Sequence, residues 1–384
     1  MVSKVQRRLE AMILGLYQKL ESFLLKSINH IWVWFIILHE WKNIFRKRDI
    51  YKNVKLTKNQ KKQIDAFFTQ SYGKKVPYYW HRLYQSYTGE FDYKYIPEII
   101  FSTKLEPNSN KRIDVLPFEN KNMLSVLFNG LNSVRTPTTY VMCINGRYFD
   151  SDRRIISQAK AIEILNEIHN GIFEAVIKIT VDTSSGKGVR MLNIVNGIDT
   201  LENEPIKSVL DKMGKNFVVQ EKIRPHNVFS NLYPKAINTL RVITYIVDDK
   251  IIIAPIIMRI GQGGGMVDNA HAGGMFIGVT DDGTLLKEAF TEYQKRYMVH
   301  PDTNVVFEGY KLPCVKEIEQ IAIRLHQQIP MLGFISWDFT VDDDDNVVLI
   351  ESNLHSQSIW MSQIAHGKAF FGDNTAKMLS ITRK

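Results

Sequence analysis

Residues 335–353 read Ile335-Ser336-Trp337-Asp338-Phe339-Thr340-Val341, then Asp342-Asp343-Asp344-Asp345-Asn346, then Val347-Val348-Leu349-Ile350-Glu351-Ser352-Asn353. Two apolar, β-prone runs joined by an acidic turn predict a β-hairpin. If the turn is centred between Asp344 and Asp345, Asp338 lies opposite Glu351, and Asn353 points to the same face because strand side chains alternate. Three oxygen ligands then share one patch.

The two facing carboxylates of this hairpin need a positive partner. Within apolar strands they repel each other and lose solvation, so we expect something positive between them. Oxygen-only ligation suits Mg²⁺, which keeps several waters and is usually completed by substrate phosphates. Asp338, Glu351 and Asn353 are therefore candidate metal ligands. The alternative is a half-exposed hairpin whose acids are simply solvated.

Composition bounds the class of protein. The chain has 384 residues, of which 45% are hydrophobic and 23% are charged. These values predict two or three lobes with their own cores, and they exclude a disordered or fibrous protein. The only cysteines, Cys143 and Cys314, have no paired spacing and no nearby His cluster, which excludes a disulfide framework and a zinc site. This usage favours a reducing compartment and a cytoplasmic protein.

The net charge of +9 is concentrated at the N-terminus, because residues 1–60 hold twelve Lys and Arg against four Asp and Glu. Apolar residues at three- and four-residue spacing predict helix over 5–48, with Trp32, Trp34 and Phe35 in its more aromatic part. A basic amphipathic helix of this kind is typical of an interfacial anchor, so residues 1–48 predict peripheral binding to an anionic membrane. A helix pair packed on the body or on a second subunit is the alternative.

No membrane-spanning helix is expected. The longest apolar run of the N-terminal region, residues 31–38, is eight residues long, whereas roughly 20 are needed to cross a bilayer. A secretory signal is not expected either, because no unbroken apolar core and small-residue cleavage site follow the first basic residues.

The middle of the chain alternates strands and helices. Apolar positions from Ile155 to Ile168 predict an amphipathic helix that begins at Arg154 and is capped by Asn170-Gly171. A strand over residues 173–179 follows. This alternation argues for α+β or α/β packing.

Lys178 ends that strand, and Asp182-Thr183-Ser184-Ser185-Gly186-Lys187-Gly188-Val189 follows it. A Lys at a strand end beside a Gly- and Ser-rich loop offers a polyphosphate one fixed cation and several backbone N–H donors. The loop is not a P-loop, because Gly186-Lys187 is followed by Gly188 rather than Ser or Thr. An ordinary hairpin turn is the alternative.

Two arginines lie within apolar strands, Arg241 in residues 238–244 and Arg259 in residues 255–261. A buried Arg is rarely unpaired, so we expect both to face anions or the acidic hairpin. Structural salt bridges are the alternative reading.

Residues 261–274 are rich in glycine. They do not form a dinucleotide fingerprint, because residues 275–279 read as a strand rather than a helix. A loop of this kind can approach a ligand closely. Asp268, Asn269 and His271 supply its polar chemistry and are candidate substrate contacts, although His271 could also be a plain loop histidine.

In combination, these motifs resemble the ATP-grasp family associated with sugar transfer and surface-polysaccharide gene clusters. The resemblance rests on Asn238-Thr239-Leu240-Arg241-Val242, Arg259-Ile260-Gly261, Val267-Asp268-Asn269-Ala270-His271-Ala272-Gly273-Gly274, Trp337-Asp338 and Glu351-Ser352-Asn353. Tyr95-Ile96-Pro97-Glu98 and Pro137-Thr138 are also similar to that family. The similarity runs from about Trp80 to the C-terminal region, and Ser352 stands where the family usually has Gly.

The resemblance implies an α+β ATP-grasp fold, in which two α+β lobes grip ATP, with an N-terminal helical region. It divides the chain into a basic amphipathic helical region (1–60), a helical substrate region (61–116), a lobe with the phosphate loop and hinge (117–222) and a lobe with the metal site (223–384). The ATP contacts it implies are Lys121, Lys178, Ser184, Ser185, Gly186, Gly188, Gln220, Glu221 and Ile223. Before Lys121, Asn120 replaces the family's usual Asp.

The activity implied is ATP-dependent ligation of a carboxylate to an amine or thiol through an acyl phosphate, with ADP as product. The implied partners are ATP, two Mg²⁺ ions, a uronic-acid-containing sugar or glycan and an amine or amino acid, in capsule or exopolysaccharide biosynthesis. The resemblance also implies that Arg241, Arg259 and His271 are the catalytic residues and that the hairpin residues bind the metal ions. Nucleic acid is not an expected partner, and oligomerisation is open. The alternatives are an ATP-grasp kinase acting on a hydroxyl and a non-catalytic, membrane-associated assembly protein.

Overall fold

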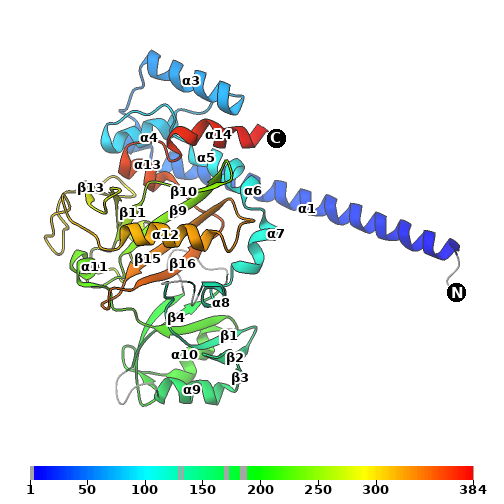
Figure 1. The fold of residues 1–384 in the computed structure, drawn as a ribbon, viewed down its shortest axis with the longest axis vertical. Coiled ribbons are helices and arrows are strands. Elements are labelled where there is room, and N and C mark those ends of the chain that lie inside the picture. Colours follow the sequence, from blue (N-terminus) through cyan, green and yellow to red (C-terminus); the bar gives the residue numbers. More distant parts are fainter. Residues whose placement is uncertain (1–3, 129–130, 132–133, 168–172, 182–187, 384) are drawn as a thin grey trace.

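The computed structural model describes residues 4–128, 131, 134–167, 173–181 and 188–383. Two eight-stranded sheets build two lobes, and helices cover both (Figure 1). Neighbouring strands run antiparallel in each sheet. The predicted α+β class, with two α+β lobes and an N-terminal helical region, is confirmed.

The smaller lobe has strand order β3-β2-β1-β8-β4-β5-β6-β7. Helices α9 (Gln158–Glu167) and α10 (Ile206–Met213) pack against this sheet, because their apolar faces share one buried core with it. The strands are β1 (Thr139–Ile144), β2 (Arg147–Asp150), β3 (Ile155–Ile156), β4 (Phe173–Ile179), β5 (Val189–Val195), β6 (Ile198–Asp199), β7 (Glu204–Pro205) and β8 (Phe217–Glu221).

The predicted helix from Arg154 begins later than expected. Ile155 and Ile156 form β3, which pairs with β2, and α9 starts only at Gln158. Ser157 explains the boundary, since its Oγ accepts a hydrogen bond from the Lys160 backbone N–H at 3.1 Å, as a helix cap does. The start of that prediction was therefore wrong. The predicted cap Asn170-Gly171 lies outside the described residues.

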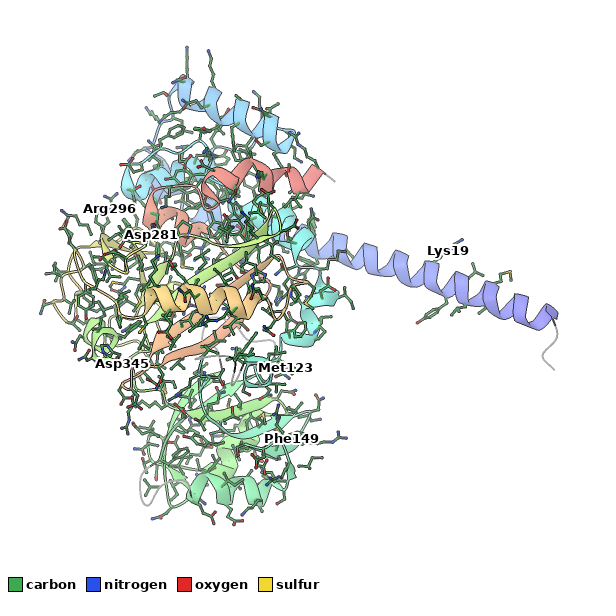
Figure 2. All side chains as sticks on the ribbon, viewed as in Figure 1. Lys19, Met123, Phe149, Asp281, Arg296 and Asp345 are labelled. Carbon is green, nitrogen blue, oxygen red and sulfur yellow. The ribbon has the colours of Figure 1, made fainter. Side chains whose placement is uncertain are left out.

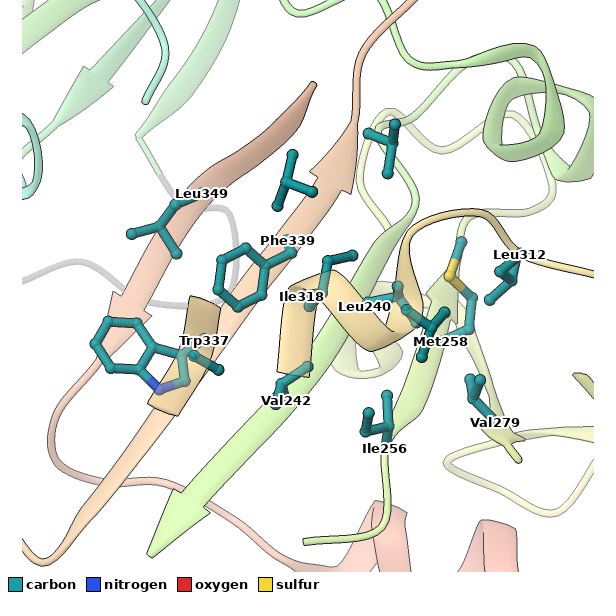
Figure 3. Close-up of a cluster of buried hydrophobic side chains, with 14 of the residues drawn as sticks. Leu240, Val242, Ile256, Met258, Val279, Leu312, Ile318, Trp337, Phe339 and Leu349 are labelled. Atoms are coloured by element: carbon teal, nitrogen blue, oxygen red, sulfur yellow. The ribbon is translucent and has the colours of Figure 1, made fainter. Parts of the chain in front are cut away.

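The larger lobe has strand order β14-β13-β12-β11-β9-β15-β16, with β10 paired to β9. Helix α12 (Val315–His326) covers one face, where Ile318 packs with Trp337 and Phe339 in the main core (Figure 3). The strands are β9 (Thr239–Val247), β10 (Lys250–Ile253), β11 (Ile257–Ile260), β12 (Met275–Val279), β13 (Leu285–Thr291), β14 (Arg296–Tyr297), β15 (Phe334–Val341) and β16 (Val347–Asn353).

Helices close to both termini cover the opposite face of the larger sheet. They are α2 (Arg48–Tyr51), α3 (Lys58–Tyr72), α4 (Tyr79–Thr88), α5 (Glu98–Ile100), η1 (Phe101–Leu105), α6 (Glu106–Ser109), α13 (Trp360–His366) and α14 (Thr375–Ser380). Successive side chains of β9 point to opposite faces of the sheet. Val242 packs in the core on the α12 side, and its neighbour Ile243 packs with Phe101 and Phe370 on the other side. Further short helices are α7 (Arg112–Val115), η2 (Leu116–Phe118), α8 (Met123–Phe128), α11 (Asn227–Leu232), η3 (Ala270–Ala272), η4 (Gly372–Asn374) and η5 (Ile381–Arg383).

The acidic hairpin forms as predicted, although its turn is centred elsewhere. Val341 pairs with Val347, which centres the turn on Asp344. A one-residue bulge at Ile350 then restores the expected register, so Asp338 faces Glu351. The predicted pairing of the two acids is confirmed, and the assumed turn centre was wrong.

Helix α1 (Lys4–Arg46) is 43 residues long, which corresponds to about 65 Å of α-helix. Its C-terminal end packs on the body, where Ile44 is buried and Trp41 makes an edge contact with Trp80. The rest projects away from both lobes, and Lys19 lies far out on it (Figures 1 and 2). Along the helix large apolar side chains are exposed, namely Met12, Ile13, Leu14, Leu16, Tyr17, Leu20, Ile31, Trp32, Trp34, Phe35 and Leu38.

In the described part of the chain, no helix is long and apolar enough to cross a membrane. The helix predicted over residues 5–48 is confirmed to within two residues at each end. One end of the helix packs on the body, as the packed alternative expects, whereas binding of the helix to a membrane stays a prediction.

Candidate active site

The turn of the acidic hairpin lies where the two lobes meet. Backbone hydrogen bonds attach a connecting segment to each side of it: Leu349 N donates to Arg135 O at 2.9 Å, and His226 N donates to Val341 O at 2.8 Å. Both connections between the lobes therefore run along the strands β15 and β16.

Arg135 ties the hairpin to the smaller lobe through two carboxylates. Its Nη2 lies 2.6 Å from Glu221 Oε1 at the end of β8, and its Nε lies 3.2 Å from Asp342 Oδ2 at the start of the turn. Glu221 also accepts a hydrogen bond from the Thr138 backbone N–H at 3.0 Å. This side chain was not predicted from the sequence.

Asp338 is almost fully buried beside two arginines. Arg241 binds it with two hydrogen bonds, Nε to Oδ1 at 2.8 Å and Nη2 to Oδ2 at 2.7 Å, and Arg259 Nη1 reaches Oδ2 at 3.1 Å. Asn353 Nδ2 donates to the same Oδ2 at 3.3 Å, which places Asn353 on the face of Asp338. The expectation that both arginines face the acidic hairpin is confirmed.

These arginines keep Asp338 charged. Burial alone raises the pKa of a carboxyl group, but the fields of Arg241 and Arg259 outweigh it, so the pKa of Asp338 lies below its usual value. Arg259 has a second carboxylate partner in Asp268, which also accepts from the Thr239 hydroxyl. Burial raises the pKa of Asp268 despite that ion pair. The result is a chain of alternating charges from the hairpin to the glycine-rich loop.

Glu351 faces the lysines of the smaller lobe. Lys121 Nζ lies 3.0 Å from Glu351 Oε1, and the Lys121 backbone N–H donates to Thr180 O, just beyond β4, at 3.1 Å. Lys178 lies near the end of β4, and its side-chain Nζ has no hydrogen bond or ion pair with any other described residue. Its burial lowers its pKa from 10.5 to about 8, Glu351 opposes that shift, and the nearby charge of Lys121 adds to it. Two lysines and one carboxylate thus converge between the lobes.

The other predicted ATP contacts lie on or next to the smaller sheet. Gln220 is buried on β8 and donates to Thr139 Oγ1 at 3.2 Å, and Ile223 is buried just beyond the end of that strand. Gly188 begins the return from the loop with φ of +73°, and a Cβ there would lie 2.8 Å from Ile179. Ser184, Ser185 and Gly186 lie outside the described residues.

The three candidate substrate contacts of the glycine-rich loop have different partners. Asp268 points to Arg259, whereas the Asn269 side chain accepts from the His271 backbone N–H at 2.8 Å and so starts η3. The half-exposed His271 ring contacts a different carboxylate, with its Nδ1 2.7 Å from Glu292 Oε2. Only Asp268 of the three bonds to the arginine pair.

The hairpin ligands can be tested for a fit to Mg²⁺. Among the described residues, Asp338 Oδ1 accepts from one arginine only, and Glu351 Oε2 has no protein partner. These oxygens, with the amide oxygen of Asn353, form the hard donor set that Mg²⁺ prefers. No group of three or more His, Cys, Asp and Glu side chains in the described chain could hold a metal, so phosphate oxygens and waters would have to complete the shell. The donor set fits on that condition.

Both a protein-family model and solved structures resemble this chain. A family model described as sugar-transfer associated ATP-grasp matches residues 100–377. No curated protein sequence matches the chain.

Several solved structures resemble the fold at low sequence identity. The ATP-grasp ligase PsnB, complexed with precursor peptide PsnA2 and AMPPNP, has a TM-score of 0.39 and 11% identity, over 72% of this chain and 63% of that one. D-alanyl-alanine synthetase A from Vibrio cholerae O1 biovar eltor has a TM-score of 0.40 and 12% identity, over 71% and 67%. An L-amino acid ligase from Bacillus licheniformis has a TM-score of 0.35 and 12% identity, over 66% and 44%. The match covers less than two thirds of the first and the third of these structures.

Proposed function

Because the chain belongs to the sugar-transfer associated ATP-grasp family, we propose that it is an ATP-dependent ligase that joins a carboxylate to an amine through an acyl phosphate. The observation that carries this proposal is the meeting of Lys178 from the smaller lobe, Lys121 from the segment bonded to it, and Glu351 from the larger lobe. A polyphosphate bound here would form ion pairs with both lysines. Glu351 would then lose its ion pair with Lys121 and could bind a cation. Glu351 and the two lysines are thus the groups that would bind Mg²⁺ and ATP.

Each contact of the junction has a role in binding the nucleotide. Lys121 and Lys178 hold the phosphates, together with the loop that contains Ser184, Ser185, Gly186 and Gly188. Gln220, Glu221 and Ile223 at the end of β8 hold the adenine and ribose. Two Mg²⁺ ions held by Asp338, Glu351 and Asn353 would neutralise the phosphate charge. The division of the chain at 60, 116 and 222 follows the same assignment, with the nucleotide between the last two regions.

The reaction then needs little beyond positioning and charge. An oxygen of the substrate carboxylate attacks the γ-phosphorus, the bond from that phosphorus to the bridging oxygen breaks, and ADP leaves. The amine nitrogen next attacks the acyl carbon, phosphate departs with the C–O bonding pair, and the nitrogen loses a proton. Arg241 and Arg259 stabilise the negative oxygens of the acyl phosphate, and His271, oriented by Glu292, accepts the proton.

The family description, which associates the family with sugar transfer, supports a carboxylate that is carried by a sugar. We propose a uronic-acid-containing sugar or glycan as the carboxylate substrate and an amino acid or other amine as its partner. The reaction would belong to capsule or exopolysaccharide assembly on the cytoplasmic side of a membrane.

Product analysis tests this proposal. The protein is incubated with MgATP, uronic-acid sugar nucleotides and each of a set of amino acids, and ADP, phosphate and new amides are measured. Amide formation with one ADP and one phosphate per bond supports the ligase. A stable phosphoester with no free phosphate identifies a kinase instead, and the absence of any ATP turnover across the set favours the non-catalytic assembly protein.

We further propose that the projecting part of α1 binds an anionic membrane. Its apolar side chains Met12, Leu16 and Leu20 are exposed, and it lies in the region that carries nearly all of the net positive charge. Each basic residue near an anionic surface contributes about 1 kcal/mol, and apolar burial adds to this. A lipid-linked glycan would then meet the enzyme at the surface to which both are attached.

Changing Leu16 and Leu20 together to Glu is expected to abolish binding to vesicles of phosphatidylcholine and phosphatidylglycerol, because both side chains are exposed on the projecting helix. Cosedimentation at low salt measures the bound fraction, which should also fall as salt is added. Lys62→Glu is the matched control, since it changes the net charge equally at an exposed site on α3. If both variants sediment alike, or the parent protein stays in the supernatant, the membrane proposal fails. A dimer in solution that only the double variant loses would assign α1 to a second subunit.

A further inference from the structure

A cavity of about 380 Å³ lies beneath the packed end of α1, apart from the junction of the two lobes. Its walls come from α1, α4, α5 and residues 356–360, and His271 and Glu292 close one side. Its volume lies at the lower end of the range for small-molecule sites. The nucleotide contacts proposed above do not line it.

Acceptor atoms without partners face this cavity. Glu98 is 5% exposed, and its Oε1 accepts from the Ile359 backbone N–H at 3.0 Å, but its Oε2 has no hydrogen-bond partner. Gln357 is 6% exposed, and its side-chain carbonyl oxygen is also unpartnered. Buried polar atoms are almost always hydrogen-bonded, so a donor is expected to meet these two.

Carboxyl groups are also crowded on that side of the cavity wall. Glu40, on α1, lies close enough to Glu98 to raise its pKa further, after burial has already raised it well above the usual value. Glu40 itself has only the exposed His39 ring at 3.9 Å and a long hydrogen bond from Ser102. Burial also raises the pKa of Glu106, which lines the same wall, to about 8. A cation would relieve this crowding of carboxyl groups.

The chain already holds one ammonium group in this cavity. Lys47 Nζ lies 3.2 Å from Glu292 Oε1 and 4.3 Å from the centre of the Trp360 ring. Lys47 therefore forms its ion pair with Glu292 rather than with Glu98. Its setting of one carboxylate and one aromatic face is the kind that stabilises a partly buried cation.

Two short segments connect the cavity with the charged centre at Asp338. Residues 268–271 run from the partner of Arg259 to His271 in the cavity wall, and residues 353–357 run from Asn353 to Gln357. The cavity wall is thus connected through the chain to residues that bond to Arg259 and Asp338, and the proposed nucleotide contacts do not line it.

We propose that the cavity beneath α1 binds the amine substrate as its ammonium ion, with Glu98 and Glu40 as counter-charges and Gln357 as a further acceptor. Naming the ligand as the substrate rests on the proposed ligase function. The binding of a primary ammonium group to Glu98 does not, and it can be measured without turnover.

Titration of tryptophan fluorescence measures this binding, because Trp32, Trp80 and Trp360 line the cavity. The probes are D-glucosamine, ethanolamine and L-lysine, each compared with the form in which every amino group is acetylated. At least one amine is expected to saturate the signal, and acetylation should weaken it about tenfold or more, because it removes the charge. Glu98→Gln keeps the acceptor for Ile359 and should weaken the same amine about tenfold or more.

Two further variants complete the experiment. Glu40→Gln should also weaken binding and lies at the edge of the cavity, so it serves if Glu98→Gln fails to fold. Glu163→Gln, exposed on α9 in the other lobe, should leave the affinity unchanged. The proposal is overturned if no amine in the panel saturates the signal, or if Glu98→Gln and Glu40→Gln bind it as the parent protein does.

ATP binding, followed separately by calorimetry, distinguishes this failure from that of the proposed function. If the protein binds an amine through Glu98 but does not bind ATP, the cavity is an ammonium-binding site and the proposed ligase function is wrong. If ATP-dependent amide formation is unchanged in Glu98→Gln and Glu40→Gln, the ligase function is supported and the cavity is not the amine site.

Discussion

Replacing Glu351 by Gln is expected to lower ATP turnover by roughly 10²- to 10³-fold, the loss typical when one electrostatic group of a transition state is removed. The side chain keeps its size but loses the charge that faces Asp338 across the hairpin and pairs with Lys121. The fold should persist, since Glu351 is only partly buried and leaves no unpaired charge inside the core. ADP release at saturating MgATP gives the turnover, and thermal unfolding checks the fold.

Asp344→Asn is the matched control for Glu351→Gln. It removes the same charge from the same hairpin, but Asp344 is exposed in the turn and is bonded there only through its backbone N–H to Asp342. Its turnover should stay within about twofold of the parent protein, as surface substitutions usually do. Near-normal turnover of Glu351→Gln in Mg²⁺ would show that the metal and phosphate site lies elsewhere.

The hairpin could be predicted from the sequence because local rules decide it. Alternating apolar residues fix which side chains share a face, and a run of acidic residues marks the turn. The turn centre could not be placed to one residue, since Asp342 caps the turn by accepting from the backbone N–H groups of Asp344 and Asn346. The bulge at Ile350 compensates, because any other register would turn either Asp338 or the apolar set away from its environment.

Contacts between segments far apart in the chain could not be predicted in the same way. Arg135 precedes a Pro-Thr pair in an unremarkable segment, and only the fold brings it between Glu221 and Asp342. Glu98 likewise lies in a short Pro-initiated helix, where nothing local indicates that α1 will cover it. Residues 155 and 156 fit a helical pattern and a strand equally well, and pairing with β2 decided between them.

The structure also explains why the two arginines could be predicted to face acids. Arg241 and Arg259 lie on neighbouring strands, β9 and β11, and Asp338 lies on β15 at the other side of β9. Asp338 pairs in register with Arg241, so their side chains share a face and meet directly. A guanidinium group in an apolar strand thus served as a signal for a buried carboxylate, although the identity of that carboxylate depended on strand order.

Replacing Lys178 by Ala is expected to weaken ATP binding by roughly 10- to 100-fold, because a hydrogen bond to a charged group contributes about 1.5–3 kcal/mol. Lys178 is available for this role, since its side-chain Nζ has no partner among the described residues and its side chain is held near the end of a buried strand. Calorimetric titration with a non-hydrolysable ATP analogue measures the loss. Lys222→Ala is the control, because Lys222 is exposed and pairs with Glu174 on the same lobe.

The pH dependence of that binding tests the same group independently. In the free protein burial lowers the pKa of Lys178 to about 8, although Glu351 opposes the shift, so the lysine is charged at pH 7 and loses its proton as the pH rises past 8. Bound phosphates favour the charged form and raise its pKa again. ATP affinity should therefore fall by up to about tenfold per pH unit above pH 8, with proton uptake on binding in that range.

Lys178→Arg separates this effect from other titrations, because a guanidinium group keeps its charge throughout that range. Its ATP affinity is expected to change little between pH 8 and pH 10, even if its absolute value is lower. In the free parent protein, the free energy of unfolding should rise with pH over this range, whereas the ATP affinity falls. The unfolded chain binds more protons than the native one between the folded pKa of about 8 and the usual value of 10.5, so the contribution of Lys178 to stability rises with pH across that window. An affinity profile in Lys178→Arg that falls as steeply as in the parent protein would assign the titration to another group and remove Lys178 from the phosphate site.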